Sequence, residues 1–269
     1  MKITVESIYA DVVKIRETSP LIHNITNYVV MNTTANALLA IGASPVMAHA
    51  EQEVEEMTGI ARALVINIGT LSTSWVAAMF RAALRAGELG IPVILDPVGA
   101  GATAYRTKTC HDLIDAVSLS IIRGNASEIM ALVMGETKTK GVDSSDSSFA
   151  ALDAAKRLNR DTGSTVCVSG EVDYVVVGES VITIENGHPM MGKVTGMGCS
   201  ATALCGAFAA VNSSFPAAAA GAMAVMGIAG EIATEGSEGP GSLQVNFLDA
   251  LFRLSKKDLK ERIRIGTEV

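Results

Sequence analysis

The stretch Ala63-Leu64-Val65-Ile66-Asn67-Ile68-Gly69 is apolar without alternation, apart from the polar Asn67 near its end. A strand that is covered on both faces has this pattern, because neither face meets water. Residues 70–74 then offer helix N-caps, a helix pattern runs to about Leu89, and Gly90 ends it. The stretch therefore predicts a buried strand followed by a helix, which is the repeating unit of an α/β protein.

The same rhythm of apolar runs and helix patterns continues on both sides of this stretch. Further strands are expected at 91–98, 119–125 and 165–170, with a short extended run at 44–48 and a hairpin of 174–177 with 181–184. Helices are expected at 6–17, 29–41, from 51–56 onward, at 104–117, 126–134 and 148–160, and over most of the chain from the hairpin to residue 256, with a loop at 135–147. This order predicts an α/β fold with a mostly parallel central sheet and helices on both faces. Neither a linker nor a repeat interrupts residues 1–269, so we expect a single domain.

Composition restricts the partners of the protein. Its 269 residues carry a net charge of −7 and no basic run longer than a couple of residues, which argues against nucleic acid as a partner. Apolar residues make up 49% of the chain and charged residues 18%, which is consistent with surface buried between copies of the chain. The four cysteines have no CxxC spacing, which suits a reducing compartment rather than a disulfide framework.

Two features argue against a membrane location. Residues 1–6 lack the apolar core of a signal peptide. The apolar stretch 216–233 is rich in Ala, Met and Gly rather than Leu, and Glu231 lies near its end, so a helix buried on all sides explains it better than a membrane span. We therefore expect a soluble, cytoplasmic protein with no membrane partner.

Polar residues collect where the predicted strands end. They are Asn67, Gly69, Asp96, residues 123–128 and residues 169–171. The carboxyl ends of parallel strands meet at one edge of a sheet, and ligands of such proteins bind in the crevice beyond that edge. These residues therefore mark the expected site.

Three charged residues of this set point to phosphate and magnesium chemistry. Asp96 follows four apolar residues at a strand end, where a carboxylate suits a magnesium ion held directly or through water. Glu128, in the first turn after the next strand, is a candidate second carboxylate for this ion, and the permanently charged Arg123 can contact phosphate oxygens. Each has an ordinary alternative: a turn cap for Asp96, a helix cap for Glu128 and a surface ion pair for Arg123.

A pair of glycines later in the chain supplies a candidate anion site. In Thr195-Gly196-Met197-Gly198-Cys199-Ser200 the glycines stand directly before a long run of small residues with a helix pattern. Glycine lets an anion approach backbone N–H groups, and a helix N-terminus adds unpaired N–H donors and the positive end of a dipole. The pattern favours a phosphate site, and a tight turn without a ligand is the alternative.

Other glycine patterns fit known motifs less well. Residues 187–193 match a P-loop, but Val194 stands where Ser or Thr would bind magnesium. The stretches 99–104 and 196–201 both resemble a dinucleotide fingerprint. The strand after the first ends in 123–125 without a ribose-binding acid, and the second follows no clear apolar strand. We therefore rank a dehydrogenase below a kinase.

Four segments in this order resemble the hydroxyethylthiazole kinase family of the ribokinase-like superfamily, and the likeness covers nearly the whole chain. The segments are 23–29 (HNITNYV), 96–101 (DPVGAG), 123–128 (RGNASE) and 195–199 (TGMGC). The resemblance implies a ribokinase-like fold and ATP- and magnesium-dependent phosphorylation of the primary hydroxyl of 4-methyl-5-(2-hydroxyethyl)thiazole, for thiamine biosynthesis and salvage. It also implies a homotrimer with active sites between subunits.

The resemblance further implies binding roles for individual positions. Those that would contact the thiazole are Asn27, Met47 and Gly196. Those that would contact ATP are Arg123 and Ser169. Those that would bind magnesium are Asp96 and Glu128.

The catalytic residues that the resemblance implies are Gly196, Gly198 and Cys199, in a loop that would form the anion hole for the transferring phosphoryl group. The wider superfamily usually has Asp at the position of Cys199, as the base that receives the alcohol proton, whereas the resembling family tends to carry Cys. The pKa of a free thiol is about 8.5 and falls near helix N-termini, but phosphoryl transfer depends mainly on positioning and charge stabilisation. We therefore expect Cys199 to be a weak base or mainly a packing residue.

Other functions are compatible with the same residues. A related kinase for a pyrimidine alcohol would share the phosphate-binding residues and differ only in its alcohol pocket. A dehydratase on the same fold would use ATP to activate a hydrated cofactor. A non-catalytic thiazole- or nucleotide-binding module would have less need for both Asp96 and Glu128, so the presence of both, together with the paired glycines, favours catalysis.

Overall fold

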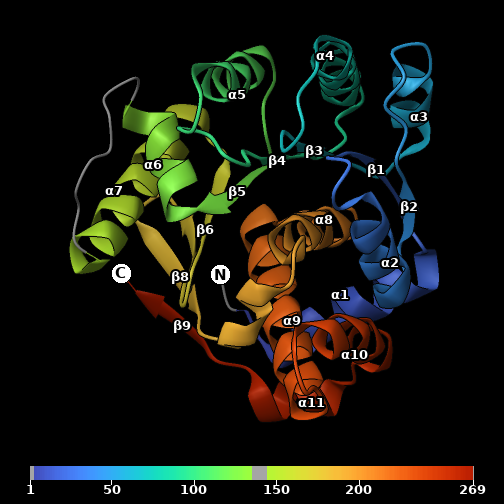
Figure 1. Cartoon of the computed structure of the whole chain (residues 1–269), viewed down its shortest axis with the longest axis vertical. Helices are drawn as coiled ribbons and strands as arrows, with labels where there is room; N and C mark the ends of the chain where they lie inside the picture. Colours follow the sequence, from blue (N-terminus) through green and yellow to red (C-terminus); the bar gives the residue numbers. More distant parts are fainter. Residues whose placement is uncertain (1–2, 135–143, 269) are drawn as a thin grey trace.

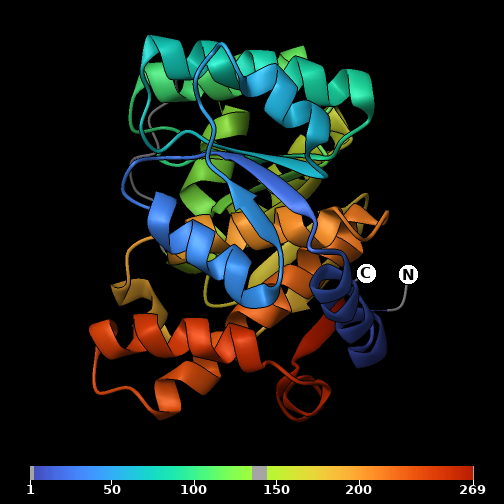
Figure 2. The same cartoon turned by 90° about the vertical axis from the view of Figure 1, so that its right-hand side faces the viewer.

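The computed structural model describes residues 3–134 and 144–268 of the chain. In this part, a nine-stranded sheet has the strand order β2-β1-β3-β4-β5-β6-β7-β8-β9 (Figure 1). Neighbours from β2 to β6 run parallel, and those from β6 to β9 run antiparallel. Figure 2 shows the sheet edge-on between two layers of helices. The predicted α/β architecture is therefore confirmed.

The parallel strands carry the candidate site at their carboxyl ends. They are β1 (Leu21–Ile25), β2 (Ser44–Val46), β3 (Ala63–Asn67), β4 (Val93–Asp96), β5 (Ile121–Asn125) and β6 (Thr165–Ser169). The sheet is extended by β7 (Asp173–Val177), β8 (Ser180–Ile184) and β9 (Ile265–Glu268), of which β7 and β8 are the predicted hairpin. Every residue of β3 and β4 is buried, which explains why continuous apolar runs predicted both strands.

The helices form two layers, and each layer has its own hydrophobic core. One face of the sheet is covered by α3 (Val54–Ile60), α4 (Thr73–Leu89), α5 (Ala104–Ala116), α6 (Ala126–Met134) and α7 (Ser144–Thr162). The other side holds α1 (Val5–Thr18), α2 (Met31–Ile41), the 3₁₀ helix η1 (Pro189–Lys193), α8 (Met197–Ala209), α9 (Phe215–Glu235), α10 (Pro240–Arg253) and α11 (Lys256–Arg262).

Local sequence signals explain where α4 begins and ends. The Ser72 hydroxyl accepts a hydrogen bond from the backbone N–H of Trp75, which is one of the N–H groups that the first turn leaves unpaired. Gly90 ends the helix in the left-handed region at φ 67°, a conformation that glycine adopts without steric cost. Both signals lie where the sequence predicted them.

Helix α9 resembles a membrane span by length and composition alone. It is the one helix of the described ranges with this character, and 72% of its apolar window is buried inside the protein. Helices α8 and α10 pack against it. The predicted core helix is therefore confirmed.

Several predicted boundaries were wrong. The predicted loop 135–147 is helical from residue 144 onward, and its residues 135–143 lie outside the described part of the chain. The Ser and Asp residues of this stretch favour loops, but they are also the residues that helix N-termini favour. Strand β4 spans only Val93–Asp96 rather than 91–98, because Pro92 and Pro97 border it and proline has no N–H to donate to a ladder.

Candidate active site

The carboxyl ends of the central strands and the start of α8 meet at one edge of the sheet. Asn67 and Asp96 are register partners at the ends of β3 and β4, as Asn125 and Ser169 are at the ends of β5 and β6. The Thr202 hydroxyl of α8 donates a hydrogen bond to Asp96 Oδ2 at 2.8 Å. The structure therefore brings Asp96 together with the helix that follows the paired glycines, as the sequence predicted.

Asp96 is a buried carboxylate held from two directions. Its Oδ2 accepts from Asn67 Nδ2 at 2.7 Å and from Thr202 Oγ1 at 2.8 Å, and no described group donates to Oδ1. Burial raises its pKa to about 7; the charge of Arg123 and the hydrogen bond from Thr202 oppose this rise, and the charge of Glu128 adds to it. Its ionisation therefore falls near neutral pH, where a neighbouring cation would favour the charged form.

Glu128 joins two loops beside Asp96. Its Oε1 accepts from the N–H of Gly99 at 2.9 Å, and its Oε2 accepts from the N–H of Asn125 at 2.8 Å. Gly99 adopts φ 72° in the turn after β4, where glycine avoids strain. Glu128 thus caps the start of its own helix, as the alternative interpretation held, and also holds the loop that follows Asp96.

Arg123 is buried rather than part of a surface ion pair, so that alternative is wrong. Its side chain is 8% exposed, and Nη1 donates to the carbonyl oxygen of Gly198 at 3.0 Å. Its Nε has no partner among the described residues. A Cβ at Gly198 would lie 3.0 Å from Nη1, so a larger residue there would have to displace the guanidinium by a few tenths of an ångström. Arg123 thus keeps an unused donor beside the paired glycines.

The start of α8 has the properties of an anion site. Gly196 is its N-cap residue at φ 84°, and no side chain caps the helix. Met197 and Gly198 line the neighbouring pocket. Because the first N–H groups of a helix have no partner within it, this end can bind negatively charged oxygen atoms.

Cys199 is a neutral thiol at physiological pH. Its Sγ accepts a long hydrogen bond from Asn27 Nδ2 at 3.6 Å. Burial, followed by the nearby charge of Asp96, raises the pKa of the thiol to about 11. The helix N-terminus was expected to lower this pKa, but the buried surroundings and the carboxylate outweigh it.

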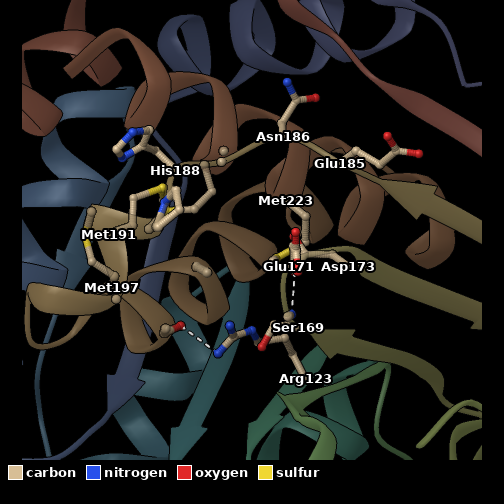
Figure 3. Close-up of a pocket in the computed structure, with 18 residues that line it drawn as sticks. Arg123, Ser169, Glu171, Asp173, Glu185, Asn186, His188, Met191, Met197 and Met223 are labelled. Atoms are coloured by element: carbon tan, nitrogen blue, oxygen red, sulfur yellow. Dashed lines mark hydrogen bonds between the residues drawn. The ribbon is translucent and has the colours of Figure 1, made fainter. Parts of the chain in front are cut away.

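A pocket of about 710 Å³ opens beside the start of α8. Arg123 and Ser169 lie at one end of it, and Glu185 and Asn186 at the other (Figure 3). Its volume falls within the range of about 300–1,000 Å³ that is typical of small-molecule sites. The Ser169 hydroxyl donates to the carbonyl oxygen of Gly124 at 3.3 Å.

Of the sequence-predicted residues, Arg123, Ser169 and Gly198 line this pocket, and six do not: Asn27, Met47, Asp96, Glu128, Gly196 and Cys199. Asn27 is 5% exposed and contacts Cys199 from the β1 side. Met47 is half-buried in the segment after β2. That segment is held by the buried His23, whose Nε2 lies 2.8 Å from the carbonyl oxygen of Ala48. The structure thus joins Asn27 to the site through Cys199, and leaves Met47 outside the pocket.

Thr202 belongs to the site although no sequence pattern predicted it, and Asn67 belongs to it without a predicted role. Thr202 stood in a run of small residues that was read only as a helix pattern, although its hydroxyl is fully buried and bonded to Asp96. Its spacing of four from Gly198, which places both on one helix face, was the available signal. Asn67 is predicted only as a polar residue at a strand end, because two of its partners, Asn27 and Asp96, lie about 30 to 40 residues away along the chain.

The donor set fits a magnesium ion that also binds phosphate. The described residues contain no group of three or more His, Cys, Asp or Glu side chains placed to hold a metal. Magnesium commonly uses only one or two carboxylates and completes its shell with water and substrate phosphates. Asp96 offers an oxygen to which no described group donates, and a cation would relieve its repulsion with Glu128.

Comparison with known proteins gives consistent matches. Residues 12–257 match the hydroxyethylthiazole kinase family. A protein from Syntrophus aciditrophicus named hydroxyethylthiazole kinase is 65% identical over 266 residues, which are 98% of each chain. The solved structure of a hydroxyethylthiazole kinase from Pyrococcus horikoshii OT3 is 42% identical with a TM-score of 0.91, over 98% of this chain and 100% of that one.

A more distant structure resembles the fold alone. A ribokinase-like superfamily protein from Enterococcus faecalis V583 has a TM-score of 0.61 at 14% identity, over 88% of this chain and 87% of that one. The ribokinase-like fold that the sequence predicted is therefore confirmed.

The variant Asp96→Asn is expected to change how stability depends on pH. An unfolded aspartate ionises near pH 3.8 and the folded one near pH 7. The native protein therefore loses unfolding free energy as pH rises between these values, by up to about 4 kcal/mol, and a neutral amide does not. In metal-free buffer, the Tm of the variant minus that of the native protein should be more positive at pH 8 than at pH 5. The exposed Asp249 provides the control Asp249→Asn, and equal differences at both pH values would contradict the prediction.

Proposed function

The chain belongs to the hydroxyethylthiazole kinase family, and from this premise we propose that it transfers the terminal phosphoryl group of ATP to the primary hydroxyl of 4-methyl-5-(2-hydroxyethyl)thiazole. The product is the thiazole phosphate used in thiamine biosynthesis and salvage. One observation carries the proposal: the uncapped start of α8 lines a 710 Å³ pocket together with Arg123, and the same helix binds the buried carboxylate of Asp96 through Thr202.

ATP would occupy this pocket, with its phosphates toward α8. Arg123 and Ser169 line the pocket and are the proposed ATP contacts. The guanidinium of Arg123, whose Nη1 donates to the Gly198 carbonyl oxygen, would place positive charge beside the phosphate oxygens. The N–H groups behind Gly196 and Gly198 would stabilise the charge on the transferring group, which is the largest contribution that a protein makes to phosphoryl transfer.

The thiazole alcohol would approach from the opposite side of the α8 start. Consecutive residues of that turn face two directions: Gly198 accepts from Arg123, and Cys199 accepts from Asn27. This arrangement supports an alcohol held by Asn27 and Gly196 on one side and a phosphoryl donor on the other. Met47 is the third proposed contact and would pack against the thiazole ring.

Asp96 and Glu128 are the proposed magnesium residues. When bound, the ion supplies positive charge to the phosphate oxygens. The chain's part is to keep Asp96 ionised and oriented through Asn67 and Thr202, and to hold the loop after Asp96 through Glu128.

The proposed assembly is a homotrimer with active sites between subunits. Tyr28 and Val29 directly follow Asn27 and are 63% and 69% exposed, although both are large and mostly apolar. Val245 and Phe252 of α10 are also exposed, at 63% and 71%. A second copy of the chain that covers Tyr28 and Val29 would close the side of Asn27 that the pocket does not reach.

We further propose that the protein works in the cytoplasm as one domain over residues 1–269, without nucleic acid or membrane partners. All four cysteines are free, and Cys110, Cys167 and Cys205 are buried, which supports a reducing compartment. The single sheet that runs from β2 to β9 supports one domain.

A coupled ADP-release assay tests the activity. Turnover is expected with ATP and the thiazole alcohol, with a kcat/KM on the order of 100-fold above that for a pyrimidine alcohol, because only the acceptor pocket discriminates between them. Chelation with EDTA should stop turnover and added magnesium should restore it. Preference for the pyrimidine alcohol would indicate the related kinase, and binding without turnover would indicate a non-catalytic module.

The variants Cys199→Ala and Asp96→Ala are expected to differ widely in activity. A positioned general base contributes about 10²–10⁴-fold, so a weakly basic thiol should cost less than about 100-fold in kcat. Loss of Asp96 removes charge stabilisation and should cost on the order of 10³-fold. Steady-state kinetics at pH 7.5 measure both, and an equally deep loss in the two variants would show that Cys199 is an essential base.

Light scattering during size-exclusion chromatography tests the assembly. The expected mass is three times the 27.9 kDa of one chain. The variant Val29→Arg places a charge on the exposed apolar surface, and it should lower the mass and raise the KM for the thiazole alcohol by about tenfold. A fully active monomer would contradict the shared site.

A further inference from the structure

Asn67 lies between Asn27 and Asp96 and does not line the pocket. It ends β3 between β1 and β4 and is 1% exposed. Its amide makes three hydrogen bonds: Nδ2 donates to Asp96 Oδ2 at 2.7 Å, and Oδ1 accepts from Asn27 Nδ2 and from the N–H of Gly69, both at 2.9 Å. One side chain thus connects the proposed alcohol contact to the proposed magnesium carboxylate.

We propose that Asn67 is a positioning residue, which couples Asn27 at the acceptor end of the site to Asp96 at the phosphoryl end. The inference rests on the proposed function, because it takes Asn27 as the alcohol contact. The affinity for the alcohol would then depend on the Asn67 side chain, even though the alcohol would contact Asn27 and not Asn67.

The direction of the hydrogen bonds makes an amide necessary at this position. Asn67 must accept on the side of Asn27 and donate on the side of Asp96, and asparagine has one group of each kind. Its acceptance from Asn27 Nδ2 also sets the orientation of the Asn27 amide, whose Oδ1 then accepts from the N–H of Val29 at 3.1 Å. Flipping Asn27 would break both bonds, so Asn67 determines which atoms Asn27 presents to an alcohol.

Close packing prevents another group from taking the place of this contact. A Cβ at Gly69 would lie 2.6 Å from Asn27 Nδ2, so Asn27 rests directly on the Gly69 backbone. Arg106 of α5 holds the same backbone, because its Nη2 donates to the carbonyl oxygen of Gly69 at 2.8 Å and its Nη1 to that of Val98 at 2.6 Å. The loops after β3 and β4 are therefore clamped together around Asn67.

A variant of Thr202 can distinguish effects on Asp96 from effects on Asn27. The Thr202 hydroxyl donates to the same Asp96 oxygen as Asn67, and the second acceptor within reach of that hydroxyl is the Gly198 carbonyl oxygen at 3.3 Å rather than Asn27. Thr202→Val therefore disturbs Asp96 without releasing Asn27, whereas Asn67→Ala does both.

Calorimetric titration with the thiazole alcohol, without nucleotide or magnesium, tests the acceptor half. Asn67→Ala should raise the Kd about tenfold, as should Asn27→Ala, and Thr202→Val should leave it within about twofold. Combining Asn27→Ala with Asn67→Ala should weaken binding no further than either alone, because both break one interaction.

Steady-state kinetics test the coupling. Asn67→Ala should lower kcat and raise the KM for the alcohol, each about tenfold, and leave the KM for ATP within about twofold. Thr202→Val should lower kcat only. Asn159 is the matched control, a buried asparagine that donates to the Ser164 carbonyl oxygen at 2.6 Å and accepts from the N–H of Gly178 at 2.7 Å, so Asn159→Ala should lower Tm without changing the alcohol Kd.

Asn67→Ser provides a second variant that keeps a polar group on β3. A serine hydroxyl is too short to reach both partners, so the Kd and kcat should shift in the same direction as in Asn67→Ala. An alcohol Kd equal to the native value in both folded Asn67 variants, or fully additive effects with Asn27→Ala, would overturn the coupling alone. A native protein that neither binds nor phosphorylates the alcohol would overturn the proposed function and the coupling together.

Discussion

The buried carboxylate of Asp96 is the constraint on which the rest of the site depends. A charge removed from water destabilises a protein unless hydrogen bonds and opposite charges compensate it. Here the compensating groups are Asn67 of β3, Thr202 of α8 and Arg123 of β5, which come from three separate elements. These groups offset only part of the cost of burying the charge, so the pKa of Asp96 stays near 7. A cation beside Asp96 would stabilise the charged form. The strand edge and the start of α8 therefore have to meet at this point.

Helix α8 meets the sheet there because its residues are small. A Cβ at Gly206 would lie 2.6 Å from Val65 Cγ2 of β3, so the helix rests close against the sheet below the site. At its N-terminus, Gly198 gives room for Arg123, and Cys199 contacts Asn27. One turn of helix thus separates the proposed nucleotide pocket from the proposed alcohol side, and its N–H groups lie between them.

Four strands show which parts of the fold the sequence pattern predicts and which it does not. The runs that became β3 and β4 were recognised because strands buried on both faces are apolar throughout. Strand β1 was missed, since its His23 and Asn24 are polar and yet buried, and His23 hydrogen-bonds to Thr58 and to the Ala48 backbone. Strand β9 was missed because it pairs with β8, about eighty residues earlier, and four residues carry no period of their own.

The sequence by itself determined the alternation of strands and helices, the candidate residues Asp96, Arg123, Glu128 and the paired glycines, and the family resemblance, because each is encoded in a contiguous stretch. Only the tertiary structure decided that burial raises the pKa of the Cys199 thiol, that Thr202 and Asn67 share one oxygen of Asp96, and that Asn27 lies apart from the pocket beside α8. Burial and hydrogen bonding between distant segments set these properties, and neither is a property of any one segment.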